Sequence, residues 1–204
     1  MESLALAFSS GWASGINAYL VVLVLGIADR VGDYPDIPNV LARWDVLAIA
    51  GFLFAMEFVA DKIPYLDSTW DAISTLIRPT AGAVIGALLA GTVAEDASLD
   101  VIVLSAVGGG TALLSHLSKA GLRLAINTSP EPATNIGVSL LEDFSVLVII
   151  AFAVEHPRLA AAIAAVLLVA GLVLLFLAAK LVRRGWRRWK SRGRSTDRPT
   201  GTVP

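Results

Sequence analysis

The sequence predicts an all-α fold, a polytopic membrane helix bundle of about six spans. Of its 204 residues, 56% are hydrophobic and only 16% are charged, whereas a soluble domain carries roughly 25% charged residues. Lipid must therefore be the solvent for much of the chain. Six apolar stretches support this fold, and they run over residues 4–28, 46–60, 80–94, 99–124, 136–154 and 159–182.

The distribution of basic residues predicts the orientation of the bundle. Nine of the 16 Lys and Arg residues follow Ala179, and most of the others flank the second and fourth links. The link at residues 95–100 is acidic and holds no basic residue. Six spans place the second and fourth links and both termini on one side of the membrane. The positive-inside rule assigns that side to the cytoplasm.

The chain therefore divides into a single membrane domain over residues 1–182 and a basic juxtamembrane tail over residues 183–204. The tail interleaves Arg and Lys with Trp186 and Trp189, a composition suited to anionic lipid headgroups. Because the tail directly follows a span, we expect its basic charge to set the orientation of the chain in the membrane. No nucleic-acid partner is expected. Disorder is predicted from Thr196 onward.

The second stretch ends in a cluster of charged residues. Glu57 and Asp61 are spaced i, i+4 and share one face of a helix, with Lys62 beside them. Pro64 lacks a backbone N–H and is expected to stop this helix. Charged groups at membrane depth are costly, so they are expected to face a cavity or one another.

The same spacing recurs just before the third stretch. Asp67 and Asp71 lie i, i+4 on a segment whose apolar residues, Leu66, Trp70, Ile73 and Ile77, form a stripe at helical spacing. This pattern predicts a short amphipathic helix that lies in the interface or re-enters the membrane. Arg78 and Pro79 would then begin the third helix, with proline in its first turn.

A second polar region follows the same plan of helix, proline-containing break and helix. One face of the fourth stretch carries His116, Lys119, Arg123 and Asn127. Residues 127–135 include Pro130 and Pro132 and cannot be helical throughout. Further polar residues, Asn135, Ser139, Glu142 and Asp143, lie in this run and at the start of the fifth stretch. The shared layout predicts an internal repeat of two Pro-broken helical regions.

Asn17 is a polar residue inside the apolar first stretch, between Gly15 and Ala18. Two nearby glycines and an amide can mark a bend that faces a cavity. Equally, the Asn17 amide can hydrogen-bond to another helix. The sequence leaves both interpretations open.

Both polar regions fall on the same predicted side of the membrane, so their charges can meet. One interpretation is an ion-pair lock between two broken helices. The other, which the number of charged groups favours, is a ligand site built on discontinuous helices, as in transporters. In that site Lys119, Arg123 and Arg78 would hold an anionic group, and the four carboxylates of residues 57–71 would carry protons or cations.

An enzymatic alternative rests on Asp67 and Asp71. Their Asp-x-x-x-Asp spacing is used for diphosphate by magnesium-dependent membrane transferases, so a divalent cation between them could serve chemistry on a lipid phosphate. The rest of those signatures is missing from the sequence. A non-enzymatic protein without cofactors is therefore the leading prediction, and the metal content stays open.

These residues also resemble a family of bacterial membrane proteins described as domain of unknown function 4126. The resemblance covers roughly residues 10–158. It rests on residues 15–20, Glu57, residues 61–67, Trp70, Asp71, Arg78, Pro79, His116, residues 119–123, residues 127–132, Asn135, Glu142 and Asp143. It implies an integral membrane protein whose motif residues are the functional ones, and it supplies no activity.

We therefore predict a small membrane transporter, channel or lipid-headgroup carrier in a bacterial inner membrane. Its polar site would lie near the cytoplasmic face and take a small polar or anionic ligand, with membrane lipids and a second copy of the chain, in a homodimer, as further partners. The predicted site residues are Asn17, Glu57, Asp61, Lys62, Asp67, Asp71, Arg78, His116, Lys119, Arg123, Asn127, Asn135, Glu142 and Asp143. The alternatives are the metal-dependent enzyme and a structural or assembly protein with a charged lock.

Overall fold

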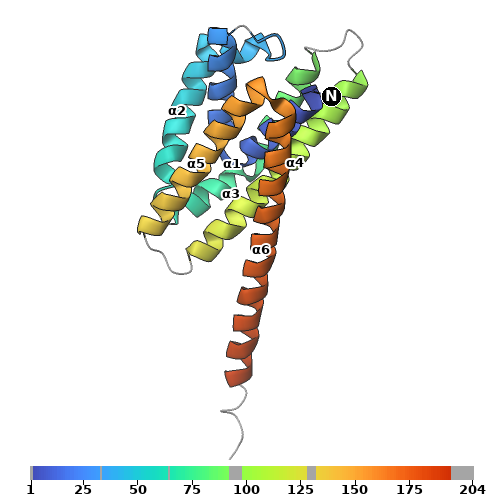
Figure 1. The fold of residues 1–204 in the computed structure, drawn as a ribbon. Coiled ribbons are helices and arrows are strands. Elements are labelled where there is room, and N and C mark those ends of the chain that lie inside the picture. Colours follow the sequence, from blue (N-terminus) through green and yellow to red (C-terminus); the bar gives the residue numbers. More distant parts are fainter. Residues whose placement is uncertain (1, 33, 64, 92–97, 128–131, 194–204) are drawn as a thin grey trace, which may run out of the picture.

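The computed structural model describes residues 2–32, 34–63, 65–91, 98–127 and 132–193. These residues form α-helices and one short 3-10 turn, without a strand among them (Figure 1). The elements are α1 (Glu2–Gly32), η1 (Asn39–Ala42), α2 (Trp44–Ala60), α3 (Leu66–Gly91), α4 (Ser98–Ile126), α5 (Pro132–Glu155) and α6 (Pro157–Gly193). The predicted all-α polytopic bundle is confirmed.

Five helices in the described part of the chain are long and apolar enough to cross a membrane. They cover Glu2–Gly32, Leu66–Gly91, Leu99–Ile126, Ala133–Glu155 and Pro157–Arg184. α2 has 17 residues and would extend about 25 Å along its axis, slightly less than the roughly 30 Å of a hydrocarbon core. The chain is a multi-pass membrane protein.

α1 is the central helix of the bundle, and it is broken in the middle. Asn17 has φ −151° and ψ 94°, which is extended rather than helical backbone. A straight helix of 31 residues would hold its ends about 46 Å apart. Instead, Glu2 and residues 34–37 line one small cavity together with Pro157. α1 therefore enters the bundle, turns at Asn17 and returns to the same end (Figure 1).

Two polar contacts join both ends of α1 to the junction of α5 and α6. The Tyr34 hydroxyl donates to Glu155 Oε1 at 2.5 Å, and this hydrogen bond raises the pKa of the Tyr34 phenol. Arg158 Nη2 lies 3.2 Å from Glu2 Oε1. In Figure 1 the C-terminal part of α6 lies at the opposite end of the bundle and extends beyond the other helices.

Small residues allow α1, α3 and α4 to approach closely. A Cβ added at Gly15 would lie 2.9 Å from the His116 backbone nitrogen, and one at Gly82 would lie 2.6 Å from the Gly108 carbonyl oxygen. Neither position has room for a larger side chain without a backbone shift. Gly108 and Gly109 thus belong to helix packing, since a Cβ added at either would contact α3.

The path of α3 differs from the sequence prediction. A separate helix over 66–77 followed by a new start at Arg78 and Pro79 is wrong, because α3 is continuous and contains Pro79 in its interior. One buried stripe runs along the whole helix, over Asp67, Asp71, Ser74, Arg78, Gly82, Ile85, Gly86, Leu89 and Ala90. Packing of this stripe favours a single helix axis. Neighbouring groups in a bundle can compensate for the missing proline donor.

The second predicted break agrees with the helix ends. α4 ends at Ile126 and α5 begins at Pro132, whereas residues 128–131, including Pro130, lie outside the described residues. Pro64 and the segment from Thr196 predicted to be disordered also lie outside them.

α6 continues through the predicted domain boundary at residue 182 as far as Gly193. The internal repeat itself stays a prediction.

Candidate functional site

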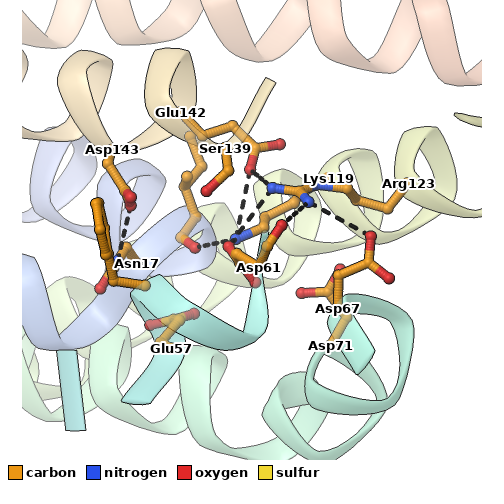
Figure 2. Close-up of polar contacts among 12 residues, drawn as sticks. Asn17, Glu57, Asp61, Asp67, Asp71, Lys119, Arg123, Ser139, Glu142 and Asp143 are labelled. Carbon is orange, nitrogen blue, oxygen red and sulfur yellow. Dashed lines mark hydrogen bonds and ion pairs between the residues drawn. The ribbon is translucent and has the colours of Figure 1, made fainter. Parts of the chain in front are cut away.

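The predicted site residues converge inside the bundle, around the break in α1. Figure 2 shows carboxylates from α2, α3 and α5 pointing toward the amine and guanidinium groups of α4. Most of these side chains are almost completely buried, with exposures of 0–8% for Asn17, Glu57, Asp61, Asp67, Asp71, Arg78, His116, Lys119, Arg123, Asn127, Asn135 and Asp143. Burial at this depth means that each charge must find its partners within the protein.

Arg78 joins the break in α1 to the carboxylates of α2 and α3. Its Nη2 forms an ion pair with Glu57 Oε1, and its Nη1 lies 2.9 Å from Asp71 Oδ1. Nη1 also approaches the Gly15 carbonyl oxygen at 3.4 Å. The guanidinium thus uses its planar set of donors to hold three segments together.

The contacts of His116 determine its tautomer. Arg78 can only donate hydrogen bonds, so the His116 Nδ1 at 2.9 Å from Nη1 is an acceptor. The ring proton then lies on Nε2, which donates to Thr75 Oγ1 at 3.0 Å, while the Thr75 hydroxyl donates to the Asp71 carbonyl. His116 is therefore a neutral link in this chain.

Lys119 lies at the centre of the network. Its Nζ contacts Asp61 Oδ2 at 2.6 Å and Glu142 Oε2 at 3.5 Å, and it donates to the Ile16 carbonyl at 3.0 Å. Ile16 is the last residue before the break in α1, so its carbonyl is at the negative end of a half-helix. An ammonium group is the kind of charge that such an end stabilises.

Arg123 has a similar role one turn further along α4. Its Nη2 lies 2.6 Å from Glu142 Oε2, and its Nη1 lies 3.4 Å from Asp67 Oδ2. Nη1 also donates to the Asp61 carbonyl at the C-terminal end of α2, at 2.8 Å. Both α4 cations therefore bind a carbonyl at a helix end as well as carboxylates.

The Asp67 carboxylate accepts hydrogen bonds from side-chain amides of the second polar region. Asn127 Nδ2 donates to Asp67 Oδ1 at 2.8 Å, and Asn135 Nδ2 donates to Asp67 Oδ2 at 3.0 Å. Asn127 also reaches Ser68 Oγ at 2.8 Å. These bonds tie the start of α3 to the end of α4 and the start of α5.

Asn17 marks a bend in α1 and also hydrogen-bonds to another helix. It is the residue at which α1 bends, and its Oδ1 accepts from the Leu20 backbone N–H at 3.0 Å, the hydrogen bond of an N-cap. Its Nδ2 also donates across to Asp143 Oδ1 at 2.9 Å. The amide therefore starts the second half of α1 and joins it to α5.

Lys62 lies at the edge of the network rather than within it. Its Nζ donates to the Phe58 carbonyl at 2.8 Å, contacts Ser139 Oγ at 3.4 Å and lies 2.9 Å from the centroid of the Phe58 ring. The side chain is only half-buried. It is the predicted site residue with the weakest connection to the others.

Negative charge exceeds positive charge in the described part of this network. Six carboxylates, Glu57, Asp61, Asp67, Asp71, Glu142 and Asp143, face four basic side chains, Lys62, Arg78, Lys119 and Arg123. Several buried oxygens also lack a donor among the residues that the structure describes: Glu57 Oε2, Asp61 Oδ1, Asp71 Oδ2, Asn127 Oδ1, Asn135 Oδ1 and Asp143 Oδ2. The site therefore has unused capacity to accept hydrogen bonds or coordinate a cation.

The enzymatic alternative assigns a divalent cation to the pair Asp67 and Asp71. In the structure, Arg123, Asn127 and Asn135 surround Asp67, and Arg78 lies against Asp71. Among the described residues there is no cluster of three or more His, Cys, Asp or Glu side chains suited to a metal ion. Donors, rather than further acidic ligands, surround these two carboxylates.

Two cavities are lined by residues of the network. A cavity of about 140 Å³ between α1, α4, α5 and α6 is lined by Trp12, Ser115, Lys119, Glu142 and Leu168 among others. A wider groove, of about 700 Å³, lies between α2 and α5 and reaches Asp143. Glu142 is the most exposed of the six carboxylates, with a side-chain exposure of 17%.

Some members of the network were not predicted from the sequence. The carbonyls of Gly15 and Ile16 acquire their role only through the bend of α1, and a backbone carbonyl has no sequence signal. Ser115 Oγ donates to the Trp12 carbonyl at 2.6 Å, and Thr75 links His116 to α3. Their spacing could have revealed them, since Ser115 precedes His116 and Thr75 lies one turn after Asp71.

Many of the motif residues behind the predicted resemblance lie in this network, among them Glu57, Asp61 and Arg78. No curated protein and no solved structure matches the chain. The model of the family described as domain of unknown function 4126 matches residues 4–177. The chain therefore belongs to the domain of unknown function 4126 family.

Proposed function

We propose that this protein is a small membrane transporter whose buried carboxylates carry protons or a small cation together with a polar solute. The observation behind this proposal is the surplus of carboxylates and unpaired acceptor oxygens around the break in α1. Ionised carboxylates without counter-charges are strongly disfavoured away from water. Taking up protons or a cation would neutralise the surplus, and releasing them would restore it.

The backbone at the site supports this proposal. Transporters commonly bind solutes and coupling ions where a helix is interrupted inside the membrane, because carbonyls at the break have no helical partner. Here the carbonyls of Gly15 and Ile16, next to the break, lie against Arg78 and Lys119. Movement of either cation would expose a carbonyl to a ligand.

The contacts favour cations over anions as the first ligand. The predicted anion-binding groups, Lys119, Arg123 and Arg78, each already contact carboxylates. An anionic ligand would have to displace those carboxylates, whereas a proton or cation can bind oxygens that have no donor. An anion can then follow only after the carboxylates have been neutralised.

Charge displacement tests this proposal without knowledge of the solute. Protein in liposomes on a supported membrane is exposed to a jump in pH or in Na⁺ concentration, and the transient current is recorded. Wild-type protein is expected to give a transient. Glu57→Gln and Asp143→Asn are expected to reduce the displaced charge, because each replaces one buried ionisable carboxylate with a neutral amide.

Glu155→Gln is the matched control, since Glu155 is an exposed carboxylate at the far end of α5. It is expected to leave the transient unchanged. If neither jump gives a transient above that of empty liposomes, the transporter proposal is rejected, and the ion pairs act as a structural lock.

The bend in α1 leads us to propose an orientation that differs from the predicted one. Helices α2 to α6 would cross the membrane, while α1 would enter and return. In Figure 1, α2 and α4 begin and α5 ends at the end of the bundle that holds both ends of α1. The charged residues at or beside these helix ends are Glu2, Asp29, Asp36, Asp45, Asp100 and Glu155 against Arg30, Arg43 and Arg158. The other end carries Lys62, Lys180, Arg183 and Arg184. The positive-inside rule places this second end in the cytoplasm and the N-terminus outside.

Single cysteines can test this orientation, because the chain has none. Ser3→Cys and Asp36→Cys are expected to react with a membrane-impermeant maleimide on intact cells. Tyr65→Cys and Arg184→Cys are expected to react only after permeabilisation. Protection of Ser3→Cys in intact cells would restore the predicted cytoplasmic N-terminus. A bacterial inner membrane and a homodimer stay predictions.

A further inference from the structure

The groove between α2 and α5 opens on the outer surface of the bundle. Apart from Asp143 it is lined by apolar side chains, Leu20, Phe54, Leu140, Leu141, Phe144 and Leu147. Leu141 is 67% exposed and Phe144 63% exposed, so the groove is open on its outer side. A volume of about 700 Å³ is sufficient for a small amphiphile.

One charged group lies at the inner end of this apolar groove. Asp143 is 8% exposed, and its Oδ1 accepts from Asn17. Its Oδ2 has no hydrogen-bond partner in the described part of the chain. The nearby base does not supply one, since Lys62 Nζ is bonded to the Phe58 carbonyl and lies beside Ser139 Oγ. The groove therefore combines apolar walls with one unused carboxylate oxygen.

We infer that this groove binds an amphiphilic amine that enters from the lipid. Its ammonium would lie on Asp143 Oδ2, and its hydrocarbon part would lie along the leucine and phenylalanine side chains. The faces of Phe54 and Phe144 would add favourable contacts to a cation. A purely apolar chain would leave the carboxylate oxygen unpaired, and an anionic head would be repelled by it.

The charge balance of this step is simple. An amine crosses the hydrocarbon core as the neutral base and reaches Asp143 after this carboxylate has taken up a proton, the uptake that the proposed function assigns to it. The proton moves from Asp143 Oδ2 to the amine nitrogen, and the products are a carboxylate and an ammonium in contact. No net charge enters the membrane in this step, so it avoids the cost of an isolated ion. The inference rests on the proposed function, because it names a solute class for the same carboxylate site.

Binding of matched eight-carbon probes tests the inference. Protein in nanodiscs of zwitterionic lipid is titrated with radiolabelled octylamine, and octanol and octanoate are used as competitors. Octylamine is expected to bind saturably, octanol to compete weakly and octanoate not at all. Asp143→Asn is expected to weaken octylamine binding by about tenfold or more, the cost of losing one charged hydrogen bond.

A second variant tests the groove independently, so that the test still holds if Asp143→Asn does not fold. Leu141→Trp changes an exposed side chain on the groove wall, narrows the groove and is expected to weaken octylamine binding. Leu76→Trp is its control, since Leu76 is 80% exposed on α3 and does not line the groove. Its affinity for octylamine is expected to equal that of the wild type.

The inference is overturned if octanol binds as tightly as octylamine and Asp143→Asn has no effect. In that case the groove is a surface that contacts lipid chains only. The charge-displacement measurement separates this failure from that of the proposed function. A proton-driven or Na⁺-driven transient without amine binding would leave the transporter proposal standing.

Discussion

Asp61→Ala is expected to lower the free energy of unfolding by about 3–5 kcal/mol, the typical cost of removing one partner from a buried ion pair. Asp61 Oδ2 lies 2.6 Å from Lys119 Nζ and 3.5 Å from Arg123 Nη2. All three side chains are at most 2% exposed. The substitution would leave two cations close together with less negative charge around them.

Equilibrium unfolding in mixed micelles measures this effect, and Asp45→Ala is the matched control. Asp45 forms an ion pair with Arg43 at 2.7 Å, a separation close to that of Asp61 and Lys119. Both side chains of the control pair are about 60% exposed, at 63% and 59%. Exposed pairs contribute about 0–1 kcal/mol. Equal losses in the two variants would show that the interior of the bundle is hydrated.

Arg78→Leu is expected to cost a similar free energy of unfolding, about 3–5 kcal/mol. The variant would leave Glu57 and Asp71 without their cation and would remove the donor to His116 Nδ1. Arg78→Lys is expected to recover only part of the loss. A single ammonium group cannot reproduce the planar set of donors that reaches the two carboxylates and the ring together.

The double variant Arg78→Leu/Glu57→Leu separates the ion pair from general packing. Because Leu at both positions removes the uncompensated carboxylate as well, the double variant is expected to be more stable than the sum of the single losses implies. A coupling free energy of about 0.5–3 kcal/mol is typical of contacting residues. Arg158→Leu is the exposed control, since its pair with Glu2 has exposures of 70% and 59%. A coupling near zero would contradict a direct Arg78–Glu57 interaction.

These stability effects do not by themselves separate a lock from a carrier. A lock needs the ion pairs only for stability, so its carboxylates need not change their charge in the folded protein. A carrier needs carboxylates that gain and lose protons or cations while the protein stays folded. Unfolding measurements on Asp61 and Arg78 test the pairing, and charge displacement with Glu57 and Asp143 variants tests whether the charge changes.

The position of the site inside the bundle explains why its residues could be predicted from the sequence, whereas the ion pairs that they form could not. Glu57, Asp61, Lys119 and Arg123 are charged residues in or beside apolar stretches, and this is a local property of the sequence. The choice of Lys119 and Arg123 as partners for Asp61 depends on which turns of α2 and α4 lie at the same depth. Such depths depend on contacts between segments distant in the sequence, such as the close approach of Gly15 in α1 to α4.

The sequence by itself determined the helical membrane class, the positions of the apolar segments and the set of polar residues that cluster, since each follows from hydropathy and spacing along one segment. Only the tertiary structure decided that α3 continues through Pro79 and that α1 turns back at Asn17. A proline or asparagine in an apolar helix is compatible with either a straight or a broken path. The free energy that selects the path comes from other helices, through the Asn17–Asp143 bond, the Lys119 contact with the Ile16 carbonyl and the buried stripe of α3.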